Sequence, residues 1–132
     1  MDWPTLEKEI FALVKTITSK PDVIVGIVRG GIVPARLLAR ELGVKDMYCL
    51  TVKKRGDERH VTTDITDDIS GKHVLLVEDM LESGKSLAMA REYLGDKGAS
   101  VKTACLYTMP ATECKPDYSL REVDEVVEFP WE

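Results

Sequence analysis

The chain has 132 residues, of which 44% are hydrophobic and 31% charged, a composition typical of a globular protein with a buried core. Its net charge of −5 gives no general attraction to nucleic acids or anionic membranes, and no apolar stretch approaches the roughly 20 residues that a membrane helix needs. Three cysteines without CxxC spacing and only two histidines argue against a Cys/His zinc site. We therefore expect one cytoplasmic domain over residues 1–132, without nucleic-acid or membrane partners and with Cys49, Cys105 and Cys114 as buried free thiols.

The first half of the chain is predicted to alternate helices with strands. Apolar residues at three- and four-residue spacing predict an amphipathic helix over residues 4–18. A strand over 23–28 is expected next, and the turn Arg29-Gly30-Gly31 leads from it into a helix over about 34–42. A second strand is predicted over 47–52.

The second half begins with the polar and charged residues 53–72, which are typical of a mobile loop or a hairpin arm. After it we expect, in chain order, a strand over 74–77, a helix over 84–97, a strand over 101–107, a loop over 110–119 and a short last strand over 123–129. Strands that alternate with helices predict an α/β fold with an open, mainly parallel sheet and flanking helices.

The segment from Val74 to Ser86 carries the strongest functional signal. Its apolar run predicts a strand buried on both faces, and this strand ends in the adjacent carboxylates Glu78 and Asp79. Ligands of parallel sheets bind outside the carboxyl ends of the strands, where backbone N–H groups and a helix N-terminus suit a phosphate. Carboxylates suit sugar hydroxyls or Mg²⁺ held through them. The segment therefore predicts a site for a phosphate and a ribose.

A nucleotide-binding P-loop is a second way to interpret Gly84-Lys85-Ser86. That loop requires a glycine five positions before Gly84, where this chain has Asp79. A carboxylate at this position would repel the phosphates that the loop has to cradle. We therefore exclude a P-loop.

The whole segment instead resembles the signature of type I phosphoribosyltransferases, in which two acids and two apolar residues precede Asp-Thr-Gly-Lys-Thr. Members of that family bind 5-phosphoribosyl 1-pyrophosphate (PRPP). The resemblance implies that Glu78 and Asp79 hold the ribose hydroxyls, directly or through Mg²⁺. It also implies that the loop Glu82-Ser83-Gly84-Lys85-Ser86 wraps the 5-phosphate, and that the chain forms a homo-oligomer, a dimer or a tetramer.

A second segment, residues 25–35, resembles the pyrophosphate loop of the same family. The adjacent Gly30 and Gly31 allow the backbone to approach a diphosphate closely, and Arg29 adds a charge-assisted contact. In relatives the peptide that enters this loop is often cis without proline. The resemblance therefore implies a cis bond between Val28 and Arg29.

The family carries a flexible loop at residues 53–66 that closes over PRPP and excludes water. Five basic side chains lie between Lys53 and His60, where they would meet the pyrophosphate. The same charged pattern is also typical of a solvated hairpin. The sequence leaves both possibilities open.

The C-terminal residues, from about 108 to 132, are expected to form a small hood. Residues 126–132 resemble the end of the xanthine–guanine and archaeal purine phosphoribosyltransferases, where this segment contributes a base-binding strand. Their Pro-Trp-acid ending lies near the pyrophosphate-bound Mg²⁺. The resemblance therefore nominates Glu132 as a metal ligand, and Val126 and Val127 as base-binding residues.

Three positions in the expected base site depart from the family. Glu82 replaces the Asp that acts on the purine N7, Met109 replaces a Lys that recognises the 6-oxo group, and Val126 replaces an aromatic residue that stacks on the base. Base stacking contributes roughly 1–3 kcal/mol, and a hydrogen bond to a charged group about 1.5–3 kcal/mol. The loss of both would weaken base binding by several orders of magnitude.

The resemblance implies a Mg²⁺-dependent enzyme of purine salvage that transfers the phosphoribosyl group of PRPP to a nucleobase, first of all a 6-oxopurine, and releases pyrophosphate. In this scheme Arg29 and Glu82 are the catalytic residues: Arg29 holds the leaving group and Glu82 takes a proton from the base. The departures in the base site leave a second hypothesis, a non-catalytic PRPP sensor with the same fold.

Overall fold

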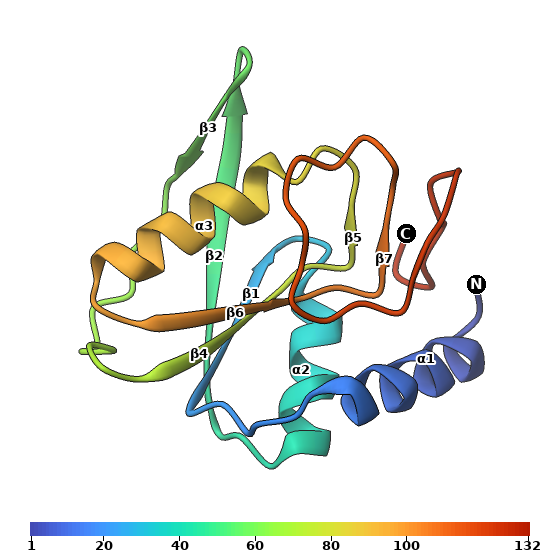
Figure 1. The fold of residues 1–132 in the computed structure, drawn as a ribbon, viewed down its shortest axis with the longest axis horizontal. Coiled ribbons are helices and arrows are strands. Elements are labelled where there is room, and N and C mark those ends of the chain that lie inside the picture. The colour runs from blue at the N-terminus through green and yellow to red at the C-terminus, as the bar shows by residue number, and fades with distance from the viewer.

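A five-stranded sheet forms the centre of the computed structural model, which describes residues 1–132 (Figure 1). From one edge to the other, its strands are β3 (Glu58–Val61), β2 (Asp46–Arg55), β1 (Val23–Val28), β4 (His73–Val77) and β6 (Ser100–Ala104). All neighbours pair in parallel except β2 and β3, which form an antiparallel hairpin. This architecture confirms the predicted α/β fold with a mainly parallel sheet.

Three helices cover the two faces of this sheet, namely α1 (Trp3–Thr16), α2 (Ile32–Leu42) and α3 (Lys85–Asp96). The first two share one hydrophobic cluster with the sheet, and α3 packs in a separate cluster on the opposite face (Figure 1). Helix α1 begins where the Asp2 side chain accepts a hydrogen bond from the backbone N–H of Thr5 at 2.9 Å. The three helices begin and end within about two residues of the predicted positions.

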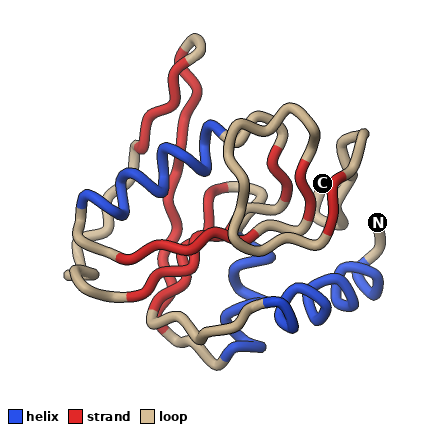
Figure 2. Tube along the Cα trace, viewed as in Figure 1, coloured by secondary structure: helices blue, strands red, loops and turns tan.

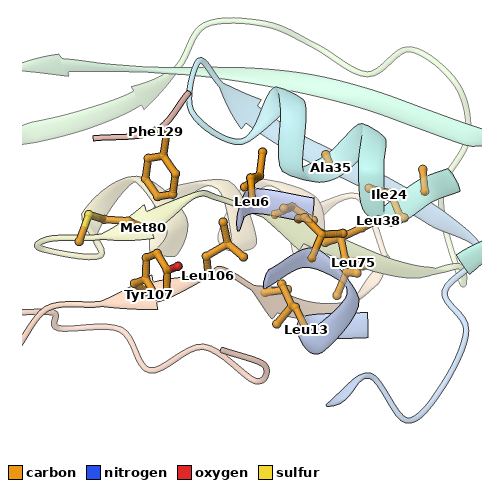
Figure 3. Packing of buried hydrophobic residues seen from close by; sticks show 14 of the residues in the cluster. Leu6, Leu13, Ile24, Ala35, Leu38, Leu75, Met80, Leu106, Tyr107 and Phe129 are labelled. Carbon is orange, nitrogen blue, oxygen red and sulfur yellow. The ribbon is translucent and has the colours of Figure 1, made fainter. Parts of the chain in front are cut away.

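The central strands β1 and β4 are buried on both faces, which explains their uninterrupted apolar sequences. Along β4, Val74 and Leu76 face α3, whereas Leu75 and Val77 face α1 and α2. Figure 3 shows the cluster shared with α1 and α2, in which Leu75 packs among residues of these two helices.

A second, smaller parallel sheet forms the hood beside the carboxyl ends of the main strands (Figure 2). It consists of three two-residue strands: β5 (Met80–Leu81), β7 (Tyr107–Thr108) and β8 (Arg121–Glu122). The predicted strand over 123–129 was wrong, because the pairing ends at β8 and only Val123 donates one further backbone hydrogen bond to Thr108. The predicted strand over 101–107 is also divided, since the N–H of Leu106 turns away to bond the carbonyl of Asp79 at 2.9 Å.

Of the predicted loop or hairpin arm over residues 53–72, the first part, up to Val61, forms a hairpin of β2 and β3, and residues 62–72 form an irregular connection to β4. Strand β2 continues to Arg55, and Gly56 adopts a positive φ of 65° in the turn to β3. The three cysteines are free as expected, but Cys49 is exposed because it lies on β2, near the edge of the sheet. No helix is both long and apolar enough to cross a membrane.

Candidate active site

The turn after β1 lies against the carboxylates that follow β4. The register pairs Gly26 of β1 with Val77 of β4, so both strands end at the same edge of the sheet. The Val28–Arg29 peptide that enters the turn is cis, as expected. A side chain on Gly30 would collide with the carboxylate of Asp79. The glycine therefore allows the loop backbone to touch an acid that the sequence assigns to the site.

Glu78 and Asp79 form a half-buried pair of like charges. The backbone N–H of Met80 donates to Oδ1 of Asp79 at 2.6 Å, and the N–H of Asp79 donates to Oε1 of Glu78 at 3.3 Å. Burial and the charge of Asp79 raise the pKa of Glu78 well above its usual value. Burial also raises the pKa of Asp79, and the nearby Glu132 raises it further. A bound cation would relieve this repulsion.

Glu78→Gln is expected to stabilise the ligand-free protein by about 1 kcal/mol at pH 7, because it removes one of two buried like charges and keeps the hydrogen-bond acceptor. When folding raises the pKa of a carboxyl group, that group lowers the stability of the fold at every pH above its pKa in the unfolded chain. The gain should therefore vanish below about pH 4. Urea unfolding at both pH values tests this, with the exposed Glu7→Gln as the control. A loss of stability in Glu78→Gln at pH 7 would contradict it.

The first of three neighbouring cavities, of about 690 Å³, opens between the turn after β1 and the end of the chain. It is lined by Val28, Arg29, Gly30, Glu78, Asp79, Met80, Trp131 and Glu132. The cavity therefore unites Arg29, both acids of the pair and Glu132, which come from three distant segments. Gly31 is buried behind the loop, where a side chain would meet the carbonyl of Val77.

The donor set of this cavity fits Mg²⁺ only together with an anionic ligand. No three His, Cys, Asp or Glu side chains converge closely enough to hold a metal ion by themselves. Mg²⁺ in proteins is commonly bound by one or two carboxylates plus substrate phosphates and water. Asp79 and Glu132, which share the cavity with Glu78, meet that requirement in type and number.

The second cavity surrounds the loop between β5 and α3. Its lining consists of Arg59, Glu78, Met80, Leu81, Glu82, Ser83, Gly84, Ser86 and Leu87. Gly84 begins α3 with a positive φ of 79°, and the N–H of Lys85 donates to the Ser83 hydroxyl at 3.3 Å. Hydroxyls, backbone N–H groups and a helix N-terminus meet here, as expected for a phosphate site. Lys85 lines a neighbouring cleft below the hairpin instead.

Arg59 is the functional candidate that the sequence did not single out. It lies on β3 and is half-buried, and it is the only basic side chain among the residues that line the second cavity. The sequence signal was the run of five basic residues, which does not reveal which one faces inward. Successive residues of a strand point to opposite faces, so the direction of Arg59 depends on the register of the hairpin, in which Arg59 pairs with Lys54.

The third cavity, of about 420 Å³, lies between the loop of residues 82–86 and the hood. Its walls are formed by Glu82, Ser83, Met109, Pro110, Ala111 and Val126. Three of the predicted base-site residues therefore come together, whereas Val127 does not line this cavity and packs against the hydrophobic core. No basic or aromatic side chain lines it, and Val126 is 62% exposed.

Two backbone hydrogen bonds fasten the loop after β7 to β5 and to the loop of residues 82–86. The N–H of Met109 donates to the carbonyl of Leu81 at 2.8 Å, and the N–H of Glu113 donates to that of Ser83 at 2.7 Å. The walls of the third cavity are thereby fixed relative to the second.

Comparison with known proteins identifies the family. Residues 2–132 match the phosphoribosyl transferase domain. Xanthine-guanine phosphoribosyltransferases from Chromohalobacter salexigens and Gluconobacter oxydans are each 30% identical to this chain. The alignments cover 100% and 98% of this chain, respectively, and 82% of each relative. The crystal structure of a purine phosphoribosyltransferase from Pyrococcus horikoshii superposes with a TM-score of 0.92 at 37% identity, over 100% of this chain and 91% of that one. The chain therefore belongs to the phosphoribosyltransferase family, among the purine phosphoribosyltransferases.

Proposed function

We propose that this protein transfers the 5-phosphoribosyl group of PRPP to a purine base, with Mg²⁺, and releases pyrophosphate. One observation carries the proposal: the three cavities are neighbours that share lining residues. The first and second share Glu78 and Met80, and the second and third share Glu82 and Ser83. They match, in order, the diphosphate, the ribose 5-phosphate and the base of the reacting pair.

On the sugar-phosphate side, the residues bind and orient. The Arg29 guanidinium and the Gly30 backbone hold the leaving diphosphate, and Glu78 and Asp79 hold the ribose hydroxyls. Asp79 and Glu132 would hold Mg²⁺, which would supply positive charge to the leaving pyrophosphate. The negative pair also stabilises the positive charge that develops on the sugar as the C1–O bond breaks.

On the base side, Glu82 acts as the general base. Glu82 lines both the second cavity, proposed for the ribose 5-phosphate, and the third, proposed for the base. In this scheme it lies where the new C1–N bond forms. As the base nitrogen displaces pyrophosphate from C1, the base loses one proton, and the Glu82 carboxylate accepts it. Carbon C1 thus exchanges one bond to oxygen for one bond to nitrogen.

A 6-oxopurine is the acceptor that we propose first. Support comes from the relatives that are named for xanthine and guanine. The apolar walls given by Met109, Pro110, Ala111 and Val126 suit the faces of a planar base. Without a basic side chain, the cavity disfavours anionic acceptors such as orotate.

Pyrophosphate release tests this function. The protein is incubated with PRPP and Mg²⁺ together with guanine, hypoxanthine, xanthine, adenine, uracil or orotate in turn. Release is expected with a 6-oxopurine and not with orotate. A PRPP sensor is the second candidate, because the base cavity lacks both a cation and an aromatic side chain. Calorimetric binding of PRPP without release for any base would favour the sensor and contradict the transferase.

Arg59→Ala is expected to raise the dissociation constant for PRPP by about 10- to 100-fold, because a hydrogen bond from a charged donor contributes about 1.5–3 kcal/mol. The free arginine makes only a 3.4 Å contact with the carbonyl of Asp57, so its loss should leave the fold intact. Calorimetric titration measures the effect. Arg55→Ala, at the exposed tip of the same hairpin, is the matched control and should bind PRPP normally. Equal affinities in the two variants would remove Arg59 from the site.

A further inference from the structure

Four aromatic rings form a continuous row from the hood to the N-terminal helix. Tyr107 stacks on Phe129 with ring centroids 6.1 Å apart, and Phe129 stacks on Trp131 at 4.8 Å with an angle of 1° between the planes. Trp131 then meets Trp3 at 6.3 Å in a tilted arrangement. These are the two tryptophans of the chain. The row therefore joins the hood, residues near the C-terminus and α1.

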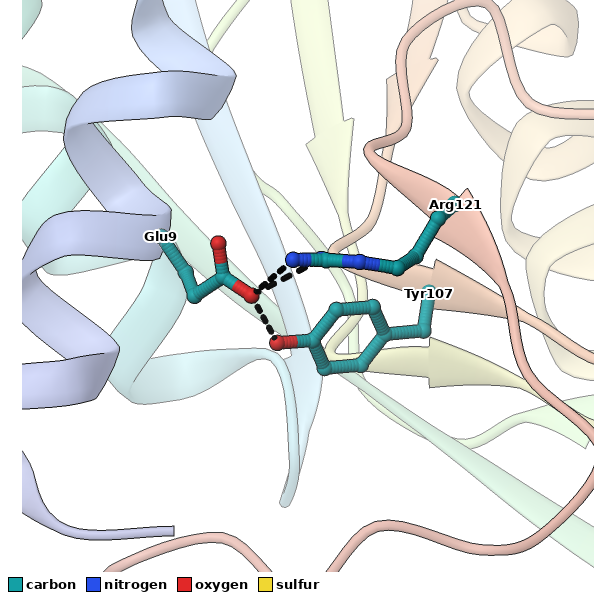
Figure 4. A network of polar contacts seen from close by, with 3 residues as sticks. All are labelled: Glu9, Tyr107 and Arg121. Atoms are coloured by element: carbon teal, nitrogen blue, oxygen red, sulfur yellow. Dashed lines mark hydrogen bonds and ion pairs between the residues drawn. The ribbon is translucent and has the colours of Figure 1, made fainter.

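Helix α1 holds this row at both ends. At one end Trp3 covers Trp131. At the other, Oε1 of Glu9 accepts hydrogen bonds from the Tyr107 hydroxyl at 2.6 Å and from the two terminal nitrogens of Arg121 at 2.8 and 2.6 Å (Figure 4). Trp3, Leu6 and Glu9 recur at three-residue spacing, so one side of the helix provides both contacts.

One inner ring of the row, that of Trp131, lines the first cavity, which is the proposed diphosphate site. Trp131 and Glu132 line this cavity together with Asp79 and Arg29. The Glu132 carboxylate accepts a hydrogen bond from the N–H of Phe129 at 3.2 Å, which turns the chain end back onto the row. The acid is therefore held to the backbone of the short segment that carries the stacked rings of Phe129 and Trp131.

Besides the row, the segment that carries Glu132 is anchored by Val127, which packs against the hydrophobic core. Residues 124–128 form no strand, and Val126 and Glu128 are exposed. The backbone nitrogen of Met1 donates to the carbonyl of Glu128 at 3.0 Å, which is again a contact from the N-terminal side, and Figure 1 shows the two chain ends close together. The core cluster that holds Phe129 also includes Leu6, Ile10 and Leu13 of α1, so this helix contributes to the position of the segment.

We propose that α1 is a positioning element of the active site: Trp3 and Glu9 clamp the aromatic row so that Glu132 stays beside Asp79 at the diphosphate cavity. This inference rests on the proposed function, because it assigns Glu132 to Mg²⁺-bound diphosphate. Neither Trp3 nor Glu9 lines any of the three cavities. They act only through the row.

Trp3→Ala tests the clamp. Trp3 is 53% exposed, so the variant should fold, and Trp131 then remains as a single fluorescent reporter inside the cavity. We expect the dissociation constant for Mg²⁺–pyrophosphate, measured by Trp131 fluorescence and by calorimetry, to rise about three- to tenfold. The KM for PRPP should rise in parallel, while the KM for the base stays unchanged. Trp3→Phe should restore tight binding.

Two further variants keep the clamp falsifiable. Phe11→Ala removes another exposed aromatic of α1 that is outside the row, and it should bind pyrophosphate normally. Glu9→Gln loosens the other end and should weaken binding in the same direction as Trp3→Ala. Normal pyrophosphate affinity in both Trp3→Ala and Glu9→Gln would overturn the clamp.

A double-mutant cycle with Glu132→Gln shows whether Trp3 acts through Glu132. Trp3→Ala in the Glu132→Gln background should cause no further loss of pyrophosphate affinity. Fully additive losses would contradict the clamp. If the unmodified protein binds neither pyrophosphate nor PRPP, the proposed function fails as well, whereas normal binding that is insensitive to Trp3 and Glu9 overturns the clamp alone.

Discussion

Glu82→Gln is expected to lower turnover about 10²- to 10⁴-fold while the affinity for PRPP stays within about twofold of the unmodified protein. The amide keeps the size of the side chain but cannot accept a proton from the base. Because Glu82 is exposed, its replacement should leave the fold intact. Steady-state pyrophosphate release and a calorimetric titration of PRPP measure the two quantities separately.

Glu113→Gln is the control for this result. Glu113 is an exposed acid in the hood, shortly after the cavity residues Met109, Pro110 and Ala111. It does not line the third cavity itself, so its variant should retain normal turnover. Unchanged turnover in Glu82→Gln would dismiss Glu82 as the base.

Gly30→Ala should weaken PRPP and pyrophosphate binding at least 100-fold. The new methyl group would occupy the position of the Asp79 carboxylate, so either this acid or the loop has to move. Both belong to the proposed diphosphate site. The loss of each charge-assisted hydrogen bond there should reduce the binding free energy by about 1.5–3 kcal/mol. The clash is with a side chain rather than with the backbone, so the fold should survive. Titration with pyrophosphate and circular dichroism test both statements.

Two other glycines provide the comparison. Gly95→Ala, in open space on α3, should leave binding unchanged. Gly31→Ala should instead lower the free energy of unfolding, because its methyl group would meet the backbone of Ile27 and Val77. Normal pyrophosphate affinity in Gly30→Ala would contradict the proposed contact between the loop and Asp79.

The main sheet and the three helices could be predicted because their apolar patterns carry the information. The continuous apolar sequences of β1 and β4 indicate strands buried on both faces, and both were predicted to within one residue. The loops at the ends of these strands were then placed correctly at one edge of the sheet, since parallel strands share that edge.

The hood could not be predicted in the same way. Strands of two residues have no periodicity, and the pairing of β5, β7 and β8 depends on contacts between segments far apart in the sequence. Val127 was assigned to the base site from the resemblance of residues 126–132 to relatives, whereas in the structure it packs against the core. Arg59 could not be distinguished from the neighbouring basic residues by sequence, because the direction of its side chain depends on the register of the hairpin.

Product analysis tests the central claim most directly. The protein, PRPP and Mg²⁺ are mixed with equal amounts of guanine, hypoxanthine, xanthine and adenine, and mass spectrometry identifies the nucleotides that form. We predict a nucleoside 5′-monophosphate of a 6-oxopurine, with one pyrophosphate released for each nucleotide and none formed by Glu82→Gln. The absence of any nucleotide from a protein that binds PRPP would contradict the assignment of Glu82 and of the third cavity to phosphoribosyl transfer.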